Sequence, residues 1–182
     1  MAEPSKKEEI MLLDIILILV LSICFVTDLK ERKIYNKVIF PALFITVALQ
    51  FAYSGLGGIK LSLLGFIIGL SILLIPFLLG GMGAGDVKLL ALIGAIKGGA
   101  FVLNTAIYMA LLGGAIAILV IIFQKQTIIL IKMIFLWIFS QFSGITYKLE
   151  FPTSFFSKKY PYGVAIVGGA IICFLCEGAW II

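Results

Sequence analysis

The sequence contains no histidine, and this absence removes several classes of enzyme. Catalytic triads that use histidine as the general base are excluded, as are metal centres with imidazole ligands. Cysteine is scarce as well, with three in 182 residues. Cys173 and Cys176 have the spacing of a zinc or redox pair, but no second pair is present to complete a zinc site. We therefore expect the cysteines to be small packing residues and the chemistry to come from other side chains.

Charged residues are also few, at 13% of the chain against 63% hydrophobic residues, and the mean hydropathy is +1.24. A soluble domain is only about half apolar, so this chain has more apolar surface than a water-exposed fold can bury. Its long apolar runs approach the roughly 20 residues that a membrane-spanning helix requires. The period-two alternation of membrane β-strands is absent. The sequence predicts an all-α, polytopic membrane helical bundle.

Short polar or glycine-rich breaks divide the apolar runs into about six transmembrane helices. The fourth of these is the shortest, because its apolar run from Leu89 to Ile96 would cover only about 12 Å. It spans a membrane only if Asp86 and Lys97 are drawn into the membrane ends. The predicted spans are residues 10–27, 38–53, 61–79, 86–97, 100–123 and 161–182.

Basic residues set the expected orientation. Four of them follow the first helix, which predicts a cytoplasmic loop there and an N-terminus outside the cell membrane. Residues 126–142 have two readings, as another span or as an amphipathic helix on the inner surface. We favour the second, because it keeps the later lysines inside. The net charge of +5 and the pI near 9.1 are then explained by cytoplasmic loops, without a nucleic-acid partner. The four residues of the first loop are Lys30, Arg32, Lys33 and Lys37.

Ionisable groups inside membrane helices are costly, so the aspartates are candidate functional residues. Asp14 lies near the start of the first helix, where the helix dipole favours an acid. Asp28 and Asp86 are both predicted at the cytoplasmic boundary. If they meet, both cannot ionise easily, and the pair provides the acid and the base of an aspartic hydrolase. One carboxylate would take a proton from water while the other, protonated, polarises the scissile carbonyl.

Neighbouring residues fit such a site. Arg32 and Asn36 follow Asp28 at i+4 and i+8, on one face if the helix continues, and would orient Asp28 or bind a substrate backbone. The alternative for Arg32 is a solvated juxtamembrane charge cluster. Gly83 and Gly85 permit backbone angles and close approach that other residues do not, so that an extended substrate strand could pair there. The alternative for these glycines is a tight turn between helices.

Together these motifs resemble the type IV prepilin peptidases, a branch of the GxGD aspartic membrane proteases. The second family motif, GxGD followed by x-K-L, is matched from Gly83 to Leu89 and includes Lys88. The first motif, an aspartate ahead of a basic residue and Ile-x-Asn, is matched from Asp28 to Asn36. A proline-aromatic-glycine element that opens the last helix is matched by Pro161, Tyr162 and Gly163.

The resemblance implies a single membrane-embedded aspartic peptidase domain over residues 1–182, in the cell membrane. Its expected activity is removal of a short basic leader from prepilin or pseudopilin precursors at the cytoplasmic face, with Asp28 and Asp86 as catalytic residues. No metal or other cofactor is expected. The inserted domain with paired CxxC motifs, associated with N-methylation in longer members, is missing, so no methyltransferase activity is expected. Short forms act on tight-adherence type pilins or on archaeal preflagellins and prepilins.

Two other classes of protein remain possible from the sequence alone. Broken helices with an acid beside a glycine break also coordinate ions in transporters and channel subunits. No inverted repeat is visible, however, and both acids are predicted at one face. A catalytically silent assembly factor with the same fold is the other reading, and the intact Asp28 and Asp86 argue against it.

Overall fold

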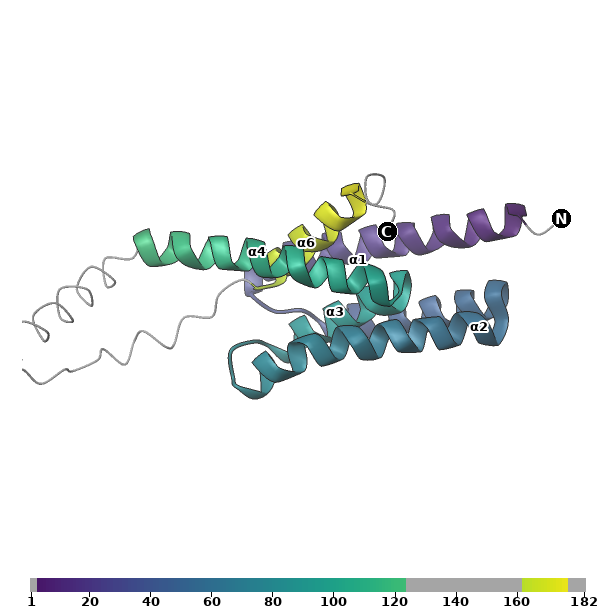
Figure 1. Ribbon diagram of the computed structural model, residues 1–182, viewed down its shortest axis with the longest axis horizontal. Helices are drawn as coiled ribbons and strands as arrows, with labels where there is room; N and C mark the ends of the chain where they lie inside the picture. The colour runs from purple at the N-terminus through teal and green to yellow at the C-terminus, as the bar shows by residue number, and fades with distance from the viewer. Residues whose placement is uncertain (1–2, 124–161, 177–182) are drawn as a thin grey trace, which may run out of the picture. The chain divides into compact units, whose positions relative to one another are not determined.

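The computed structural model describes residues 3–123 and 162–176, and this part of the chain is α-helical without strands (Figure 1). The all-α prediction is confirmed. The chain divides into two units, residues 1–112 with 161–182 and residues 113–160, and only the end of α4 is described in the second. Residues 126–142 and Pro161 lie outside the described residues. The helices are α1 (Glu3–Glu31), α2 (Asn36–Leu78), α3 (Ala84–Lys97), α4 (Gly99–Phe123) and α6 (Tyr162–Cys176).

The helix α1 begins earlier and ends later than the predicted span of residues 10–27. Its first turns are the polar stretch EPSKKEE, which contains glutamates and lysines with good helix propensity. The apolar pattern therefore located the membrane-facing part of α1 and missed its polar extensions.

The helix α2 is interrupted at Gly55, where the backbone angles φ 60° and ψ −145° are not helical. A Cβ atom placed on Gly58 would lie 2.5 Å from the carbonyl oxygen of Gln50, which a continuous helix would hold about two turns away. The chain therefore reverses at Gly55. The predicted break between residues 53 and 61 is confirmed, and each half of α2 is close to the roughly 20 residues of a membrane span.

Three of the described helices are long and apolar enough to cross a membrane, namely α1 over residues 7–31, α2, and α4 over residues 99–119. The helix α6 is a shorter apolar helix, and α3 has 14 residues. Large apolar side chains such as Phe44, Leu56 and Leu64 are exposed along α2. Surfaces of this kind are unfavourable in water and are covered by lipid in membrane proteins. The chain is a helical membrane protein.

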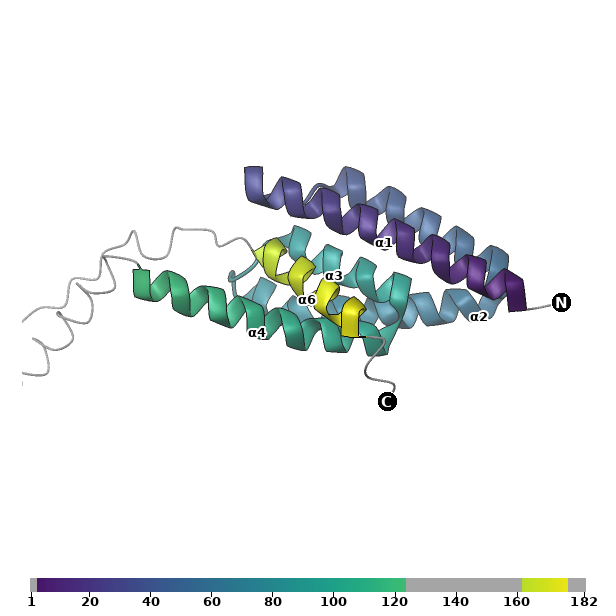
Figure 2. The same ribbon diagram turned by 90° about the horizontal axis from the view of Figure 1, so that it is seen from above.

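The short helix α3 lies at the centre of the first unit, against α1, α2 and α6 (Figure 2). Its apolar side chains from Leu89 to Ile96 are fully buried. Gly65 and Gly69, four residues apart on α2, let the backbones of α2 and α3 touch. A Cβ atom on Gly69 would lie 2.5 Å from the Leu90 carbonyl oxygen, and one on Gly65 would overlap Gly94. Small residues at this spacing are typical of close helix packing in membranes.

The packing brings different helix ends together at the two ends of α3. The end of α1 and the start of α6 meet near Asp86, whereas the start of α1 and the Gly55 turn lie near Lys97 (Figure 1). These two regions are separated by the length of α3 from Asp86 to Lys97, about 16 Å.

Candidate active site

Asp28 lies in the last turn of α1 with only 4% of its surface exposed. The N-terminus of α6 covers its carboxyl group. The backbone N–H of Val164 donates to Asp28 Oδ2 at 3.0 Å, and the N–H of Gly163 also faces this carboxyl group. Because free N–H groups and the helix dipole both favour negative charge at a helix N-terminus, this arrangement stabilises a carboxylate.

Gly163 is the residue that lets α6 approach Asp28. A Cβ atom placed there would lie 2.7 Å from both Cγ and Oδ2 of Asp28, closer than real Cβ contacts. The proline-aromatic-glycine element thus reaches Asp28 through its glycine backbone. Tyr162 opens α6 and is half-buried.

Asp86 lies in the first turn of α3 and is 9% exposed. Its Oδ2 accepts the backbone N–H of Gly83 at 3.2 Å, and its own N–H donates to the Gly83 carbonyl at 3.1 Å. Asp86 therefore also caps α3, because its carboxylate satisfies an N–H group at the helix start.

The structure brings Asp28 and Asp86 into one site, where the two carboxylates are close enough for their charges to interact. This proximity follows from the packing of α1 and α3, since the residues are far apart in the sequence. Buried carboxylates that repel each other favour a state with one proton shared or held by one of them. Such a pair supplies one acid and one base.

The two motifs also contact each other directly beside the aspartates. Lys88 Nζ on α3 donates to Asn36 Oδ1 at the start of α2, at 3.0 Å. The same ammonium lies 5.4 Å from the ring centroid of Phe40. These contacts tie the start of α2 to the start of α3, two residues from Asp86.

Arg32 ends α1 and does not continue it. Its φ of 50° is left-handed, and its N–H donates to the Asp28 carbonyl at 2.9 Å. The expectation that Arg32 and Asn36 share a helical face with Asp28 is wrong, because the helix stops at Glu31 and Asn36 begins α2. The charge of Arg32 nevertheless interacts with the Asp28 carboxylate.

Of the two glycines expected to permit unusual backbone angles and close approach, Gly85 provides close approach and Gly83 has ordinary angles. Gly83 has φ −82°, which any residue adopts, and the left-handed position of this break is Gly80 with φ 75°. Gly85 is needed for close approach, because a Cβ there would lie 2.9 Å from the Cβ of Ile34. The space beside Gly85 that was expected for a substrate strand is thus filled by Ile34, whereas Gly83 is exposed.

Two further contacts, in the connection between α1 and α2, were not predicted from the sequence. Ile34 packs on Gly85, and its only signal was its place in the Ile-x-Asn motif. The Tyr35 hydroxyl donates to the Glu31 carboxylate, one helical turn away in sequence, and this hydrogen bond raises the pKa of Tyr35. Both contacts stiffen the short connection between α1 and α2.

Asp14 does not have the position expected for it. It lies about three turns into α1, beyond the first turn where a helix dipole favours an acid. Its Oδ1 instead pairs with Lys97 Nζ at 2.8 Å, with side chains that are 25% and 13% exposed. The expectation missed this pair because α1 begins at Glu3 and because Lys97 comes from another helix.

The described residues contain no group of three or more histidine, cysteine, aspartate or glutamate side chains arranged to hold a metal ion. The groups that converge at the site are two carboxylates, the N–H groups of α6, and the cations of Arg32 and Lys88. Their chemistry is that of proton transfer at a buried acidic pair.

The chain was also compared with protein-family models. The model described as the type IV leader peptidase family matches residues 15–123. This range contains the motif from Asp28 to Asn36 and the motif from Gly83 to Leu89. No curated protein and no solved structure gives a significant match to the chain.

Proposed function

The chain belongs to the type IV leader peptidase family, and we propose that it cleaves the leader from prepilin-like precursors with Asp28 and Asp86 as an aspartic catalytic pair. The observation that carries this proposal is that two buried aspartates, at the end of α1 and the start of α3, lie near enough for the charge of Asp28 to act on Asp86. An aspartic mechanism needs two carboxyl groups at one reacting centre and needs neither histidine nor metal.

The different surroundings of the two carboxylates support different roles. Asp28 faces two backbone N–H groups and interacts with the Arg32 charge, so it is the better-stabilised anion. It would act as the general base that takes a proton from the attacking water. Asp86 accepts one longer hydrogen bond from Gly83 and would hold the proton that polarises the scissile carbonyl. Before the water is deprotonated, Asp28 is ionised and Asp86 is protonated, so the pair carries a single negative charge.

The proposed substrate class rests on the family and on the position of the basic residues. The basic loop between α1 and α2 lies beside the aspartates, and the positive-inside rule puts that end of the bundle at the cytoplasmic face of the cell membrane. A precursor would present its cleavage site there, before its apolar helix enters the lipid. We further propose about six spans and proteolysis without N-methylation, on tight-adherence type pilins or on archaeal preflagellins and prepilins.

Co-expression with prepilins from the same genome tests the proposal, with leader removal read as a mass shift. Asp28→Asn and Asp86→Asn should each lower cleavage by at least about a hundredfold, as expected when half of an acid–base pair is removed. Asp14→Asn is the matched control, because it makes the same change outside the site, and it should still cleave. EDTA should not change the rate. Normal cleavage by either site variant would refute the catalytic pair.

A further inference from the structure

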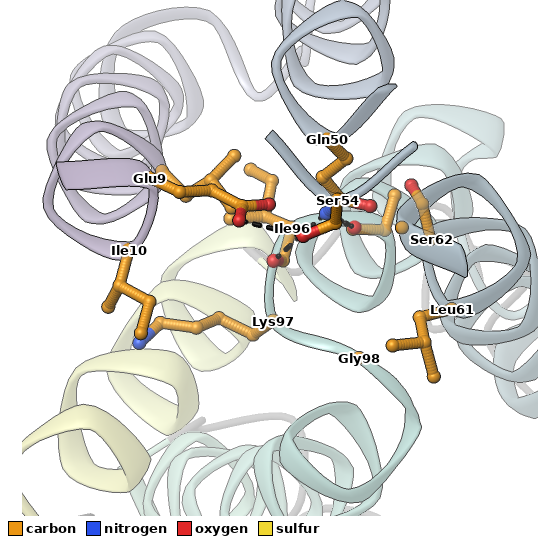
Figure 3. A pocket seen from close by; sticks show the side chains of 12 residues that line it. Glu9, Ile10, Gln50, Ser54, Leu61, Ser62, Ile96, Lys97 and Gly98 are labelled. Carbon is orange, nitrogen blue, oxygen red and sulfur yellow. Dashed lines mark hydrogen bonds between the residues drawn. The ribbon is translucent and has the colours of Figure 1, made fainter. Parts of the chain in front are cut away.

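A second polar region lies at the opposite end of α3 from the aspartates. It is a cavity of about 280 Å³ between the start of α1, the Gly55 turn of α2 and the end of α3 (Figure 3). Four polar side chains line it, and the proposed peptidase reaction uses none of them. They are Glu9, Gln50, Ser54 and Ser62, and the charged side chain of Lys97 lines the cavity as well.

Gln50 contributes a hydrogen-bond acceptor that no described residue satisfies. The side chain is 6% exposed, and its Nε2 donates to the Ala95 carbonyl oxygen at 2.9 Å. Because carbonyl oxygens only accept, the amide nitrogen must face α3, and Oε1 of this cavity-lining side chain has no partner in the described part of the chain. A buried acceptor left unpaired costs about 1–3 kcal/mol, so the cavity favours a ligand that donates.

Glu9 adds negative charge to the same cavity. It is 7% exposed, and the hydrogen bond described for it comes from the neutral Ser54 hydroxyl, at 2.8 Å to Oε2. Lys97, a cation that lines the cavity, pairs with Asp14 at 2.8 Å. Figure 3 shows the Lys97 nitrogen turned away from the group formed by Glu9, Ser54 and Gln50. Asp14 thus offsets the charge of Lys97, and the contact described for Glu9 is with a neutral hydroxyl, which favours a cationic ligand.

The end of α3 strengthens the preference for a cation. The carbonyl groups of Ala95 and Ile96 are turned to this side, where they accept from Gln50. The C-terminus of a helix carries partial negative charge, so cations are stabilised near it. The ligand favoured by these groups is positively charged and has N–H donors.

Size and surroundings favour a lipid headgroup over a small ion. A volume of about 280 Å³ is far more than the roughly 30 Å³ that one water occupies, so a single bare ion would leave the cavity unfilled. Ile10 and Leu61 also line the cavity, and they are 51% and 66% exposed. These residues give it an apolar margin on the outer surface of a membrane protein. Lys60, next to Leu61, is exposed and offers a cation to a phosphate.

We propose that this cavity binds the headgroup of phosphatidylethanolamine, a phospholipid with a primary ammonium group. The ammonium donates hydrogen bonds to Glu9 and to Gln50 Oε1, and the acyl chains lie over Ile10 and Leu61. The bound lipid fastens the start of α1 to the Gly55 turn and the end of α3. This is a binding site separate from the peptidase site and independent of the proposed catalytic roles.

Native mass spectrometry of the full chain tests the site. The protein is reconstituted in nanodiscs with equal amounts of phosphatidylethanolamine, phosphatidylcholine and phosphatidylglycerol, and the lipids that stay bound are counted. Phosphatidylethanolamine should be retained over phosphatidylcholine about tenfold, the factor expected for a charge-assisted hydrogen bond, because a quaternary ammonium has no N–H donor. Equal retention of the two lipids would overturn the proposal, and this comparison needs no variant.

A pair of variants assigns the binding to the cavity. Glu9→Gln removes the charge with little change of shape and should abolish the preference for phosphatidylethanolamine. Glu8→Gln makes the same change at the exposed neighbouring residue and should keep the preference. If Glu9→Gln retains the lipid as the unchanged protein does, the site is not this cavity.

Thermal unfolding in detergent distinguishes the lipid from other cations. Phosphatidylethanolamine should raise the melting temperature of the delipidated protein, whereas soluble ethanolamine or sodium chloride at millimolar concentration should not match it. Stabilisation by ethanolamine to the same extent would identify a free amine as the ligand, and stabilisation by sodium would identify an ion. Either result would contradict the lipid headgroup.

Discussion

The backbone of Gly163 lies against the carboxyl group of Asp28, so closely that a Cβ atom on Gly163 would be 2.7 Å from Asp28 Cγ. The contact joins residues from the two ends of the chain and places the N–H of Val164 3.0 Å from Asp28 Oδ2. It explains why a glycine stands at the start of α6. A helix N-terminus can solvate a buried carboxylate only if its backbone reaches that group without an intervening side chain.

Gly163→Ala should therefore impair cleavage strongly. The added methyl group must push Asp28 or the start of α6 away, which breaks the hydrogen bonds to the carboxylate and misplaces it. A displacement of about 1 Å at a reacting group costs on the order of a hundredfold in rate. Cleavage of a co-expressed prepilin, normalised to the amount of folded protein in the membrane, measures this loss.

Gly168→Ala is the matched control in the same helix. Its Cβ atom would lie 2.8 Å from Cδ1 of Leu112, the end of a flexible side chain that can rotate away. We expect cleavage within about threefold of the unchanged protein, because only a side-chain rotamer must adjust. Equal losses in the two variants would show that any added methyl group in α6 is harmful and that the contact with Asp28 has no special role.

The contact between Lys88 and Asn36 should act as one unit. Lys88→Ala and Asn36→Ala each remove the 3.0 Å hydrogen bond and should slow cleavage less than either aspartate change. The double variant should be no slower than the worse single variant, because the bond can be lost only once. Initial rates from the four proteins give the coupling energy, expected at about 0.5–1.5 kcal/mol. Additive effects would mean that the two residues contribute separately.

Arg32 offers a way to separate backbone strain from charge. Because its φ is 50°, Arg32→Gly relieves the left-handed backbone while it removes the guanidinium, and Arg32→Ala removes the charge alone. The glycine variant should be the more stable by about 1 kcal/mol, the usual cost of this conformation for a residue with a Cβ. Both should lose the same activity if charge beside Asp28 is what matters. Thermal unfolding and cleavage rates measure the two effects independently.

The ion pair between Asp14 and Lys97 should contribute to stability and leave the chemistry unchanged. Lys97→Met leaves Asp14 without its partner in a largely buried position and should lower the free energy of unfolding by about 1–3 kcal/mol. Combining it with Asp14→Asn should recover part of that loss, since the uncompensated charge is gone. Unfolding in detergent micelles tests this order of stabilities. A double variant less stable than Lys97→Met would contradict it.

The parts of the fold that could be predicted are those encoded by local sequence. The apolar runs predict membrane helices because only apolar side chains are stable in lipid, and the break near Gly55 follows from glycines beside polar residues. The ends of α1 were misjudged because glutamate and lysine extend a helix beyond the lipid-facing segment. The loop after α1 was predicted, but the left-handed backbone of Arg32 was not, since arginine seldom adopts a left-handed φ.

The same distinction between local sequence and tertiary packing applies to the candidate site. The residue types and their spacing in the two motifs can be recognised in the sequence, and they identify Asp28 and Asp86 as candidates without a structure. The close contacts of Gly85 with Ile34 and of Asp14 with Lys97 were not readable, because each depends on which helix packs against which. Local propensity and hydropathy carry no information about such pairs.

By itself the sequence determined that this chain is helical, that it belongs in a membrane and that two aspartates stand in peptidase motifs. Only the tertiary structure decided that Asp28 and Asp86 lie near enough for their charges to interact, that the start of α6 covers Asp28, and that Glu9 and Gln50 line one cavity at the far end of α3. The physical reason is the range of the interactions. Hydropathy and helix propensity act over a few residues, whereas these contacts arise when glycine-lined helices pack backbone to backbone.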